Sequence, residues 1–316
     1  MTVRIPQIRL ALATTGKFLK RGGQPPLLFI NIKRLKLFYT MKINDLLKLL
    51  RTPEEASIVG KTLGKLPYVL HLQKSNREII IYGTTHTGIA EKVQELKKFF
   101  ENENPNLLLI EGSVRDYINI TRTKQLSDDD LLKKFGEQAY LALIAQRKDI
   151  KVKSWDINII ERIRYALKKN LPKEDIIGYM VLIRARHEIE AGGKPSVKTV
   201  VERLENGLTK KVKKVFEDEF GIDMEDVLKN LDVISMKYAG VPLSELFLEK
   251  LKELTGPARS KGAVNMVARI MNDARDENAL KIIKDVRNKY KKILVTCGGY
   301  HFLRWEPAIK TLYKTN

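Results

Sequence analysis

The chain has 316 residues, 43% of them hydrophobic, so it can bury one large core or two modest ones, which excludes disordered and fibrous proteins. Its single cysteine excludes an internal disulfide and a cysteine-rich zinc site, and the expected compartment is therefore reducing and cytoplasmic. The net charge of +20 suggests a polyanionic partner, but its basic residues are spread along lysine-rich helices, so nucleic acid is an alternative partner and not the favoured one.

The N-terminal segment is basic and free of acidic residues. Residues 1–44 carry nine lysines and arginines, and the first carboxylate of the chain is Asp45. We expect this segment to be an N-terminal extension outside the fold. Three interpretations stay open: a start codon placed upstream of Met41, an organellar transit peptide, or a basic arm that binds a membrane surface or nucleic acid.

Hydrophobic periodicity predicts alternating strands and helices in the first half of the fold, residues 45–157. In chain order these are a helix at 43–50, hairpin strands at 68–72 and 78–82, a helix at 89–100, a strand at 107–110, a helix at 136–145 and a strand at 152–155. The run Leu-Leu-Leu-Ile at 107–110 is typical of a strand buried on both faces. Together these segments indicate βαβ units and a parallel sheet.

The rest of the chain divides into an insert and a second half. Residues 158–256 are predicted to be a helical insert that caps the edge of the sheet. Residues 257–316 contain a helix predicted over 275–290 and a strand over 293–297. The expected fold is a mixed, mostly parallel α/β sheet with helices on both faces. No stretch reaches the roughly 18 apolar residues of a membrane-spanning helix, so we expect no transmembrane segment.

Polar side chains follow the predicted parallel strands at the point where each strand ends. They are His86, Glu111, Asp156 and His301. Because the carboxyl ends of parallel strands share one edge of a sheet, where ligands bind in open α/β folds, we expect these side chains to converge.

The two histidines lie in similar motifs. Gly-Thr-Thr-His at 83–86 and Gly-Gly-Tyr-His at 298–301 both follow a strand, and each glycine is expected to permit a tight turn and a close backbone approach that aim the imidazole over the sheet edge. Two imidazoles and a carboxylate match the ligands of a divalent-metal hydrolase, which predicts His86, Glu111 and His301 as metal ligands. Without a metal, one histidine could act as general base with Glu111 orienting it.

These motifs, together with Leu-Ile-Glu at 109–111 and Arg-Asp at 275–276, resemble the TraB/PrgY/TIKI family and its wider superfamily of erythromycin esterases and ChaN-like haem binders. The resemblance covers residues 77–115 and 262–304, and 136–157 more loosely. It implies a divalent-metal-dependent peptidase or ester-cleaving hydrolase, with manganese, cobalt or zinc as the ion and a peptide or small ester as substrate. It also implies that Arg275 belongs to the site, where it would bind an oxyanion or a substrate carboxylate, with Asp156 in support.

Several residues also have a structural interpretation. Asp156 could cap a helix beginning near Ile159, Glu137 could complement a helix N-terminus, and Arg275 could form a surface salt bridge. Cys297 is expected to be a small apolar strand residue rather than a nucleophile. His71 and His187 are expected to be structural or exposed.

Two other functions stay open beside the hydrolase. The first is a non-catalytic protein that sequesters a peptide or haem in the same cleft. The second is a basic nucleic-acid-binding protein, whose affinity would fall steeply with salt and survive loss of the histidines. Assembly into a homo-oligomer is also open.

Overall fold

The computed structural model describes residues 41–84, 90–112, 128–190, 192–207, 210–258 and 262–314. The chain divides into two units, Met1–Tyr39 and Thr40–Asn316, and the first lies outside the described residues. Among the described helices, none is both long enough and apolar enough to cross a membrane.

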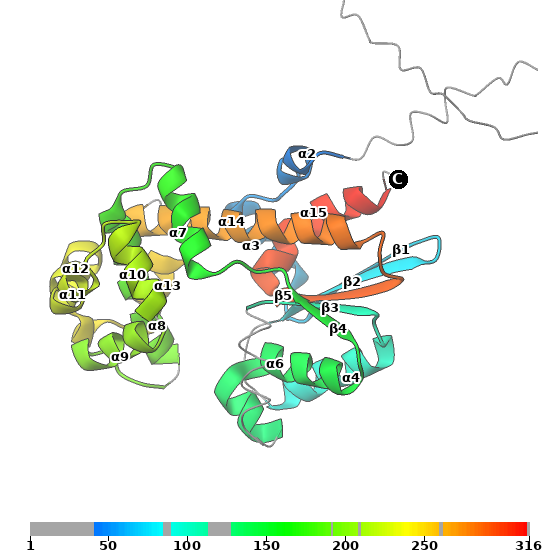
Figure 1. The fold of residues 1–316 in the computed structure, drawn as a ribbon, viewed down its shortest axis with the longest axis horizontal. Coiled ribbons are helices and arrows are strands. Elements are labelled where there is room, and N and C mark those ends of the chain that lie inside the picture. The colour runs from blue at the N-terminus through cyan, green and yellow to red at the C-terminus, as the bar shows by residue number, and fades with distance from the viewer. Residues whose placement is uncertain are drawn as a thin grey trace, which may run out of the picture. The chain divides into compact units, whose positions relative to one another are not determined.

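The second unit contains a five-stranded mixed sheet in the order β1-β2-β5-β3-β4 (Figure 1). The strands are β1 (Tyr68–Lys74), β2 (Arg77–Thr84), β3 (Leu107–Ile110), β4 (Lys151–Ser154) and β5 (Lys292–Gly298). β1 pairs with β2 as an antiparallel hairpin, and all other neighbours are parallel. The mixed, mostly parallel sheet is therefore confirmed, as is the strand at 107–110.

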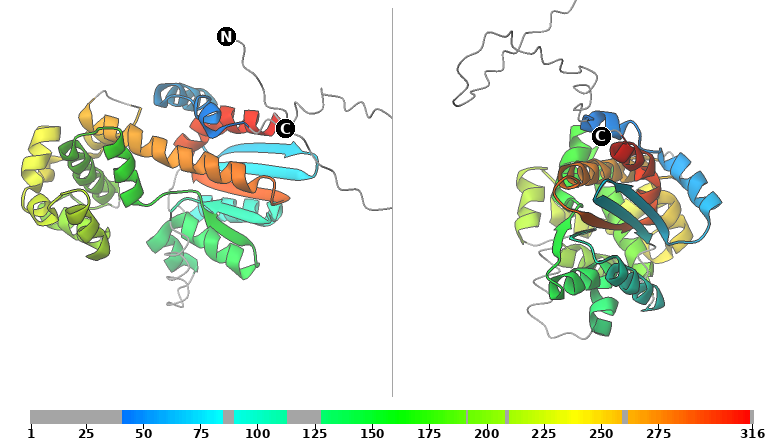
Figure 2. Two further views of the ribbon diagram at one scale, coloured as in Figure 1. Left: turned by 45° about the horizontal axis from the view of Figure 1, so that its top comes forward. Right: turned by 90° about the vertical axis from the view of Figure 1, so that its right-hand side faces the viewer.

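Helices cover both faces of this sheet (Figure 2). Successive strand residues point to opposite sides, so each strand contributes side chains to two cores. Ile79 and Ile81 face one core, which contains α2 (Ile43–Leu47), α3 (Pro53–Leu63), the C-terminal half of α14 (Ala263–Val286) and α15 (Gly299–Lys314). Ile80 and Tyr82 face the other core, which contains α4 (Ala90–Glu103) and α6 (Asp128–Arg147). Each fully buried isoleucine contributes roughly 1.5–3 kcal/mol of hydrophobic stabilisation.

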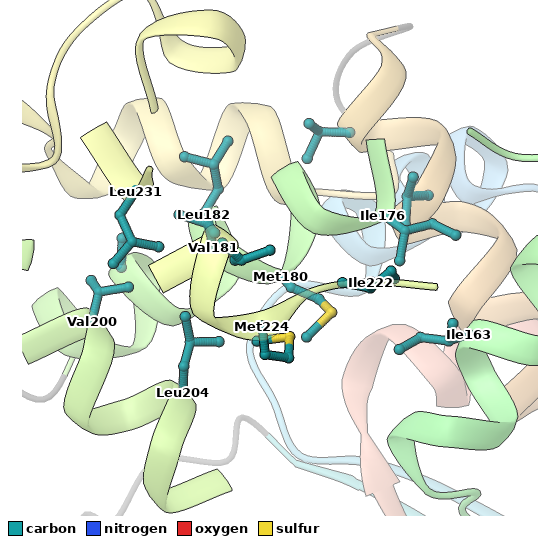
Figure 3. Packing of buried hydrophobic residues seen from close by; sticks show 14 of the residues in the cluster. Ile163, Ile176, Met180, Val181, Leu182, Val200, Leu204, Ile222, Met224 and Leu231 are labelled. Carbon is teal, nitrogen blue, oxygen red and sulfur yellow. The ribbon is translucent and has the colours of Figure 1, made fainter. Parts of the chain in front are cut away.

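Every described element between β4 and α14 is a helix. These helices are α7 (Ile159–Lys168), α8 (Lys173–Glu190), α9 (Val197–Gly207), α10 (Lys210–Asp218), α11 (Met224–Lys229), α12 (Leu231–Ala239), η2 (Leu243–Glu245) and α13 (Leu248–Thr255). Together with the N-terminal half of α14 they enclose a separate apolar core, in which Val181, Leu182 and Val200 are fully buried (Figure 3).

Helix α14 belongs to both the helical core and the sheet core (Figure 1). Its N-terminal residues Val264, Val267 and Met271 pack in the helical core, whereas Ala279 and Leu280 pack against the sheet. The expected start at residue 275 is wrong, since the apolar spacing that favours a helix already begins at Val264.

The ends of two other predicted elements also differ in the structure. β4 ends at Ser154, one residue earlier than the end predicted for this strand. Residues 298–301 were expected to form a turn, but Gly298 is the last residue of β5 and α15 begins at Gly299. Gly83 likewise lies within β2 and has no left-handed backbone conformation. Neither Gly83 nor Gly298 has the left-handed conformation typical of a glycine turn, and residues 85 and 86 of the first motif lie outside the described residues.

Candidate functional site

A cavity of about 840 Å³ lies where the carboxyl ends of β3 and β4 meet the helices. This volume falls within the range of roughly 300–1,000 Å³ that is typical of small-molecule sites. The strand ends supply Glu111 and Asp156, while α14 supplies Arg275. Helix α8 forms the facing wall with residues such as Tyr179 and Arg184.

Glu111, Asp156 and Arg275 form a cluster of ion pairs beside this cavity. Arg275 donates from Nε to Asp156 Oδ1 over 2.8 Å and from Nη2 to Asp156 Oδ2 over 3.0 Å. Its Nη2 also donates to Glu111 Oε1, while the backbone N–H of Gly298 donates to Glu111 Oε2 over 3.2 Å. Two strand ends and one helix are thus joined through a single guanidinium.

Asp156 accepts hydrogen bonds from a second arginine as well. Arg162 donates from Nη2 to both Asp156 oxygens, over 3.0 and 2.9 Å. Burial alone would raise the pKa of Asp156, but the positive charges of Arg275 and Arg162 outweigh it and hold that pKa below its usual range. Asp156 is therefore an ionised carboxylate at neutral pH. The capping alternative is wrong, because Asn158 caps α7 by accepting from the N–H of Glu161.

The Arg275 side chain is largely shielded from solvent, with 12% of it exposed. Burial opposes its charge, but Glu111 and Asp156 more than compensate and raise the pKa of Arg275. Its guanidinium carbon also lies 5.3 Å from the ring centre of Trp155, a cation–π contact. The surface salt-bridge interpretation of Arg275 is therefore wrong.

His301 lies in the first turn of α15 and is only 4% exposed. Its Nδ1 is 2.6 Å from Oδ1 of the fully buried Asp276, which also accepts from Trp305 Nε1 over 2.6 Å. Arg304 Nη1 forms an ion pair with the other Asp276 oxygen over 2.7 Å. The carboxylate fixes the imidazole with its Nδ1–H toward Asp276 and Nε2 as the basic nitrogen.

One aromatic side chain connects His301 to the ion-pair cluster. The Trp155 ring centre lies 5.3 Å from that of His301, and Arg275 contacts the same indole. Trp155 is held in place because its Nε1 donates to the carbonyl of Thr296 in β5 over 2.8 Å. Glu111, Asp156, Arg275 and His301 thus lie in one connected region at the carboxyl edge of the sheet.

Sequence analysis did not predict the buried polar network that joins Glu111 to Gln138 and Thr296. Gln138 Oε1 accepts from Thr296 Oγ1 over 2.7 Å and from the Glu111 N–H over 3.3 Å, and Thr84 Oγ1 donates to Glu137 Oε2 over 3.4 Å. Glu137 follows Gly136, whose φ of 75° interrupts α6. That glycine inside a helical pattern was the available signal.

Asp276 is the other residue whose role sequence analysis missed. It lies three and four positions before the buried Ala279 and Leu280, so it occupies the apolar face of α14. A carboxylate at such a position needs a buried partner, which here is His301.

Comparison with family models, with curated proteins and with solved structures found no match. The TraB/PrgY/TIKI resemblance therefore stays a hypothesis carried by the motifs alone.

The metal prediction depends on a residue outside the described part of the chain. His86 lies within residues 85–89, which the structure does not describe. Among the described residues, no group of three histidine, cysteine or acidic side chains could hold a metal ion, and both Glu111 oxygens already accept hydrogen bonds. These residues do not by themselves fit a metal.

The remaining histidines and the cysteine do not belong to the ion-pair cluster. Cys297 is fully buried in β5, and burial raises the pKa of its thiol well above the usual value, which favours the apolar interpretation over a nucleophile. His71 is half exposed and lies 3.3 Å from Glu78. His187 is exposed on α8 and lines the cavity.

Proposed function

We propose that the chain is a hydrolase that cleaves a peptide or ester bond in the cavity at the carboxyl edge of its sheet. The observation that carries this proposal is the 2.6 Å contact between His301 and the buried Asp276, next to Tyr300, which lines the cavity edged by Glu111 and Asp156. A histidine held by a carboxylate is the arrangement that general bases and metal-ligating histidines use. The motif resemblance supports the same reaction class.

In this proposal His301 accepts the proton of the attacking water through Nε2, because Asp276 holds the opposite nitrogen. Asp276 would stabilise the imidazolium that forms, as a carboxylate does when it orients a catalytic histidine. Arg275 is engaged by Glu111 and Asp156, so its contacts support a role in positioning these carboxylates rather than the expected binding of an oxyanion. Glu111 would then orient water or substrate at the end of β3.

A divalent metal belongs to this proposal only if His86 completes a set with Glu111 and His301. Manganese, cobalt or zinc would then supply Lewis-acid chemistry at the site. The proton transfer from water to His301 does not require that ion. Metal analysis of the purified chain and of His86→Ala tests the set, because loss of one ligand should lower the metal content.

The hydrolase proposal is tested by assaying the purified chain on peptide and ester libraries, with manganese, cobalt or zinc and with a chelator. We expect turnover that falls about 100-fold or more in Glu111→Gln, since Glu111 is placed in the reacting region. Glu78→Gln is the matched control, because Glu78 lies near the start of β2, at the edge of the sheet opposite to Glu111. Binding of a library member without turnover would instead support the sequestering protein, and absence of both would contradict the proposal.

A further inference from the structure

A second cavity lies at the opposite, amino-terminal edge of the parallel strands. Its volume is about 200 Å³, below the roughly 300 Å³ at which drug-sized sites begin, so it suits one small chemical group. It is lined by Lys74, Ser75, Arg77, Arg287, Asn288 and Tyr313. These residues come from the β1–β2 turn, the chain after α14 and the end of α15, which lie at one end of the sheet in Figure 1.

The charged residues among the described lining of this cavity all have the same sign. Lys74, Arg77 and Arg287 contribute three cations, and none of the described lining residues is acidic. Ser75, Asn288 and Tyr313 add neutral groups that can donate hydrogen bonds. Such a set favours an anion and provides no counter-charge for a cation.

Tyr313 gives an independent indication of a ligand. The residue is 8% exposed, and its hydroxyl is buried without a hydrogen-bond partner among the described residues. Burial raises the pKa of Tyr313 to about 12, although the charges of Arg287 and Arg77 oppose the shift, so the hydroxyl stays protonated at neutral pH. A buried hydroxyl without a partner is unfavourable, and an acceptor in the cavity would remove that cost.

Arg287 forms part of the wall of this cavity. It is 5% exposed, and its Nη1 donates to the carbonyl of Leu312 near the end of α15. Burial lowers the pKa of Arg287, so an anion nearby would stabilise its charged form. Satisfying the Leu312 carbonyl explains the placement of Arg287, but it does not explain the unpartnered Tyr313 hydroxyl or the two cations of the β1–β2 turn.

We propose that this cavity binds a small dianionic oxyanion of the phosphate class, to which Lys74, Arg77 and Arg287 supply positive charge and the Tyr313 hydroxyl donates a hydrogen bond. The site lies away from the carboxyl edge of the sheet, so it is separate from the proposed hydrolase site. It would bind phosphate whether or not the chain catalyses hydrolysis.

The test is calorimetric titration of the full chain with inorganic phosphate at constant ionic strength, with acetate as a singly charged comparison. We expect phosphate to bind more tightly than acetate, with affinity about tenfold weaker in Arg77→Gln and about fivefold weaker in Tyr313→Phe. Lys153→Gln removes an equal charge from the exposed side of β4, and His301→Ala alters the other site; both should bind within about twofold of wild type.

Three results would overturn this proposal. The first is no measurable heat of binding up to about 10 mM phosphate. The second is wild-type affinity in both Arg77→Gln and Tyr313→Phe. The third is a loss in Lys153→Gln as large as that in Arg77→Gln, which would indicate only general attraction to a basic chain. Melting temperatures measured without phosphate show whether each variant remains folded.

Discussion

Arg275 connects Glu111 and Asp156, so its removal should leave buried carboxylates without their main partner. We expect Arg275→Met to lower the free energy of unfolding by about 3–5 kcal/mol, the cost typical of breaking a buried ion pair on one side. Urea denaturation measures this loss. Arg164→Met is the matched control, because Arg164 forms an exposed pair with Glu219 and its loss should cost much less. Equal losses in the two variants would contradict the role of Arg275.

The lowered pKa of Asp156 predicts a specific response to acid. A carboxylate whose pKa is depressed in the folded state stabilises the fold above its unfolded pKa, near 3.9, and this contribution is lost as the pH falls through the folded value. Between about pH 4 and pH 2, wild type should therefore lose more stability than Asp156→Asn. Unfolding free energies at several pH values measure the difference, and parallel curves would disprove it.

Among single residues, the strand ends predicted the meeting of Glu111 and Asp156, because strand ends in a parallel sheet share an edge, whereas Arg275 was expected there only from the family resemblance. It did not predict that His301 pairs with Asp276, since that contact depends on how α15 packs against α14. His86 stays a prediction.

Among the secondary-structure elements, β2 and α15 lie so close together that their contact explains the glycine at position 83. A Cβ added at Gly83 would lie 2.9 Å from the Cβ of Phe302, so the strand and helix backbones are too close for a larger residue. A Cβ at Gly299 would instead meet the flexible end of Leu66, at 2.7 Å. The first glycine of the motif at 83–86 thus serves helix–strand packing.

We therefore expect Gly83→Ala to destabilise the fold by about 1–3 kcal/mol, the cost typical of overpacking. Gly299→Ala should cost less, because the Leu66 methyl groups can rotate away. Thermal unfolding of both variants gives the comparison. If Gly299→Ala were the more damaging change, the close approach at Gly83 would not be the constraint.

Element types were predicted better than element ends. The apolar run at 107–110 identified β3 because a strand buried on both faces has no polar positions. The length of α14 was underestimated, because its N-terminal half packs against helices whose arrangement no local pattern reveals. The sequence indicated that residues 158–256 are helical, but not how their helices pack.

For the whole molecule, the main feature is that α14 is shared by the helical core and the sheet core. Both tryptophans, Trp155 and Trp305, are in the sheet core, so fluorescence reports on that region while far-ultraviolet circular dichroism reports on all helices. Since one continuous helix joins the cores, we predict coincident urea transitions by the two methods. A helical transition at lower urea than the fluorescence change would show that the cores unfold separately.

The net charge of +20 also acts at the scale of the molecule, and it is the basis of the nucleic-acid alternative. Eight of the basic residues lie in residues 1–40, outside the described residues, and a ninth, Lys42, follows directly. The cavities at the two edges of the sheet instead bring charged side chains together around small volumes, which supports small ligands over a nucleic-acid surface.

Steady-state kinetics test the proposed hydrolase site most directly, through His301, which Asp276 holds, and through His86, which the motif resemblance predicts to belong to the same site. On whichever peptide or ester the chain hydrolyses, kcat/KM should fall by about 10²–10⁴ in both His86→Ala and His301→Ala. His71→Ala, a half-exposed histidine in β1, should stay within about twofold of wild type. If His301→Ala kept wild-type kcat/KM while remaining folded, the proposed catalytic site would be wrong. Wild-type kinetics in His86→Ala would rule out only the metal set.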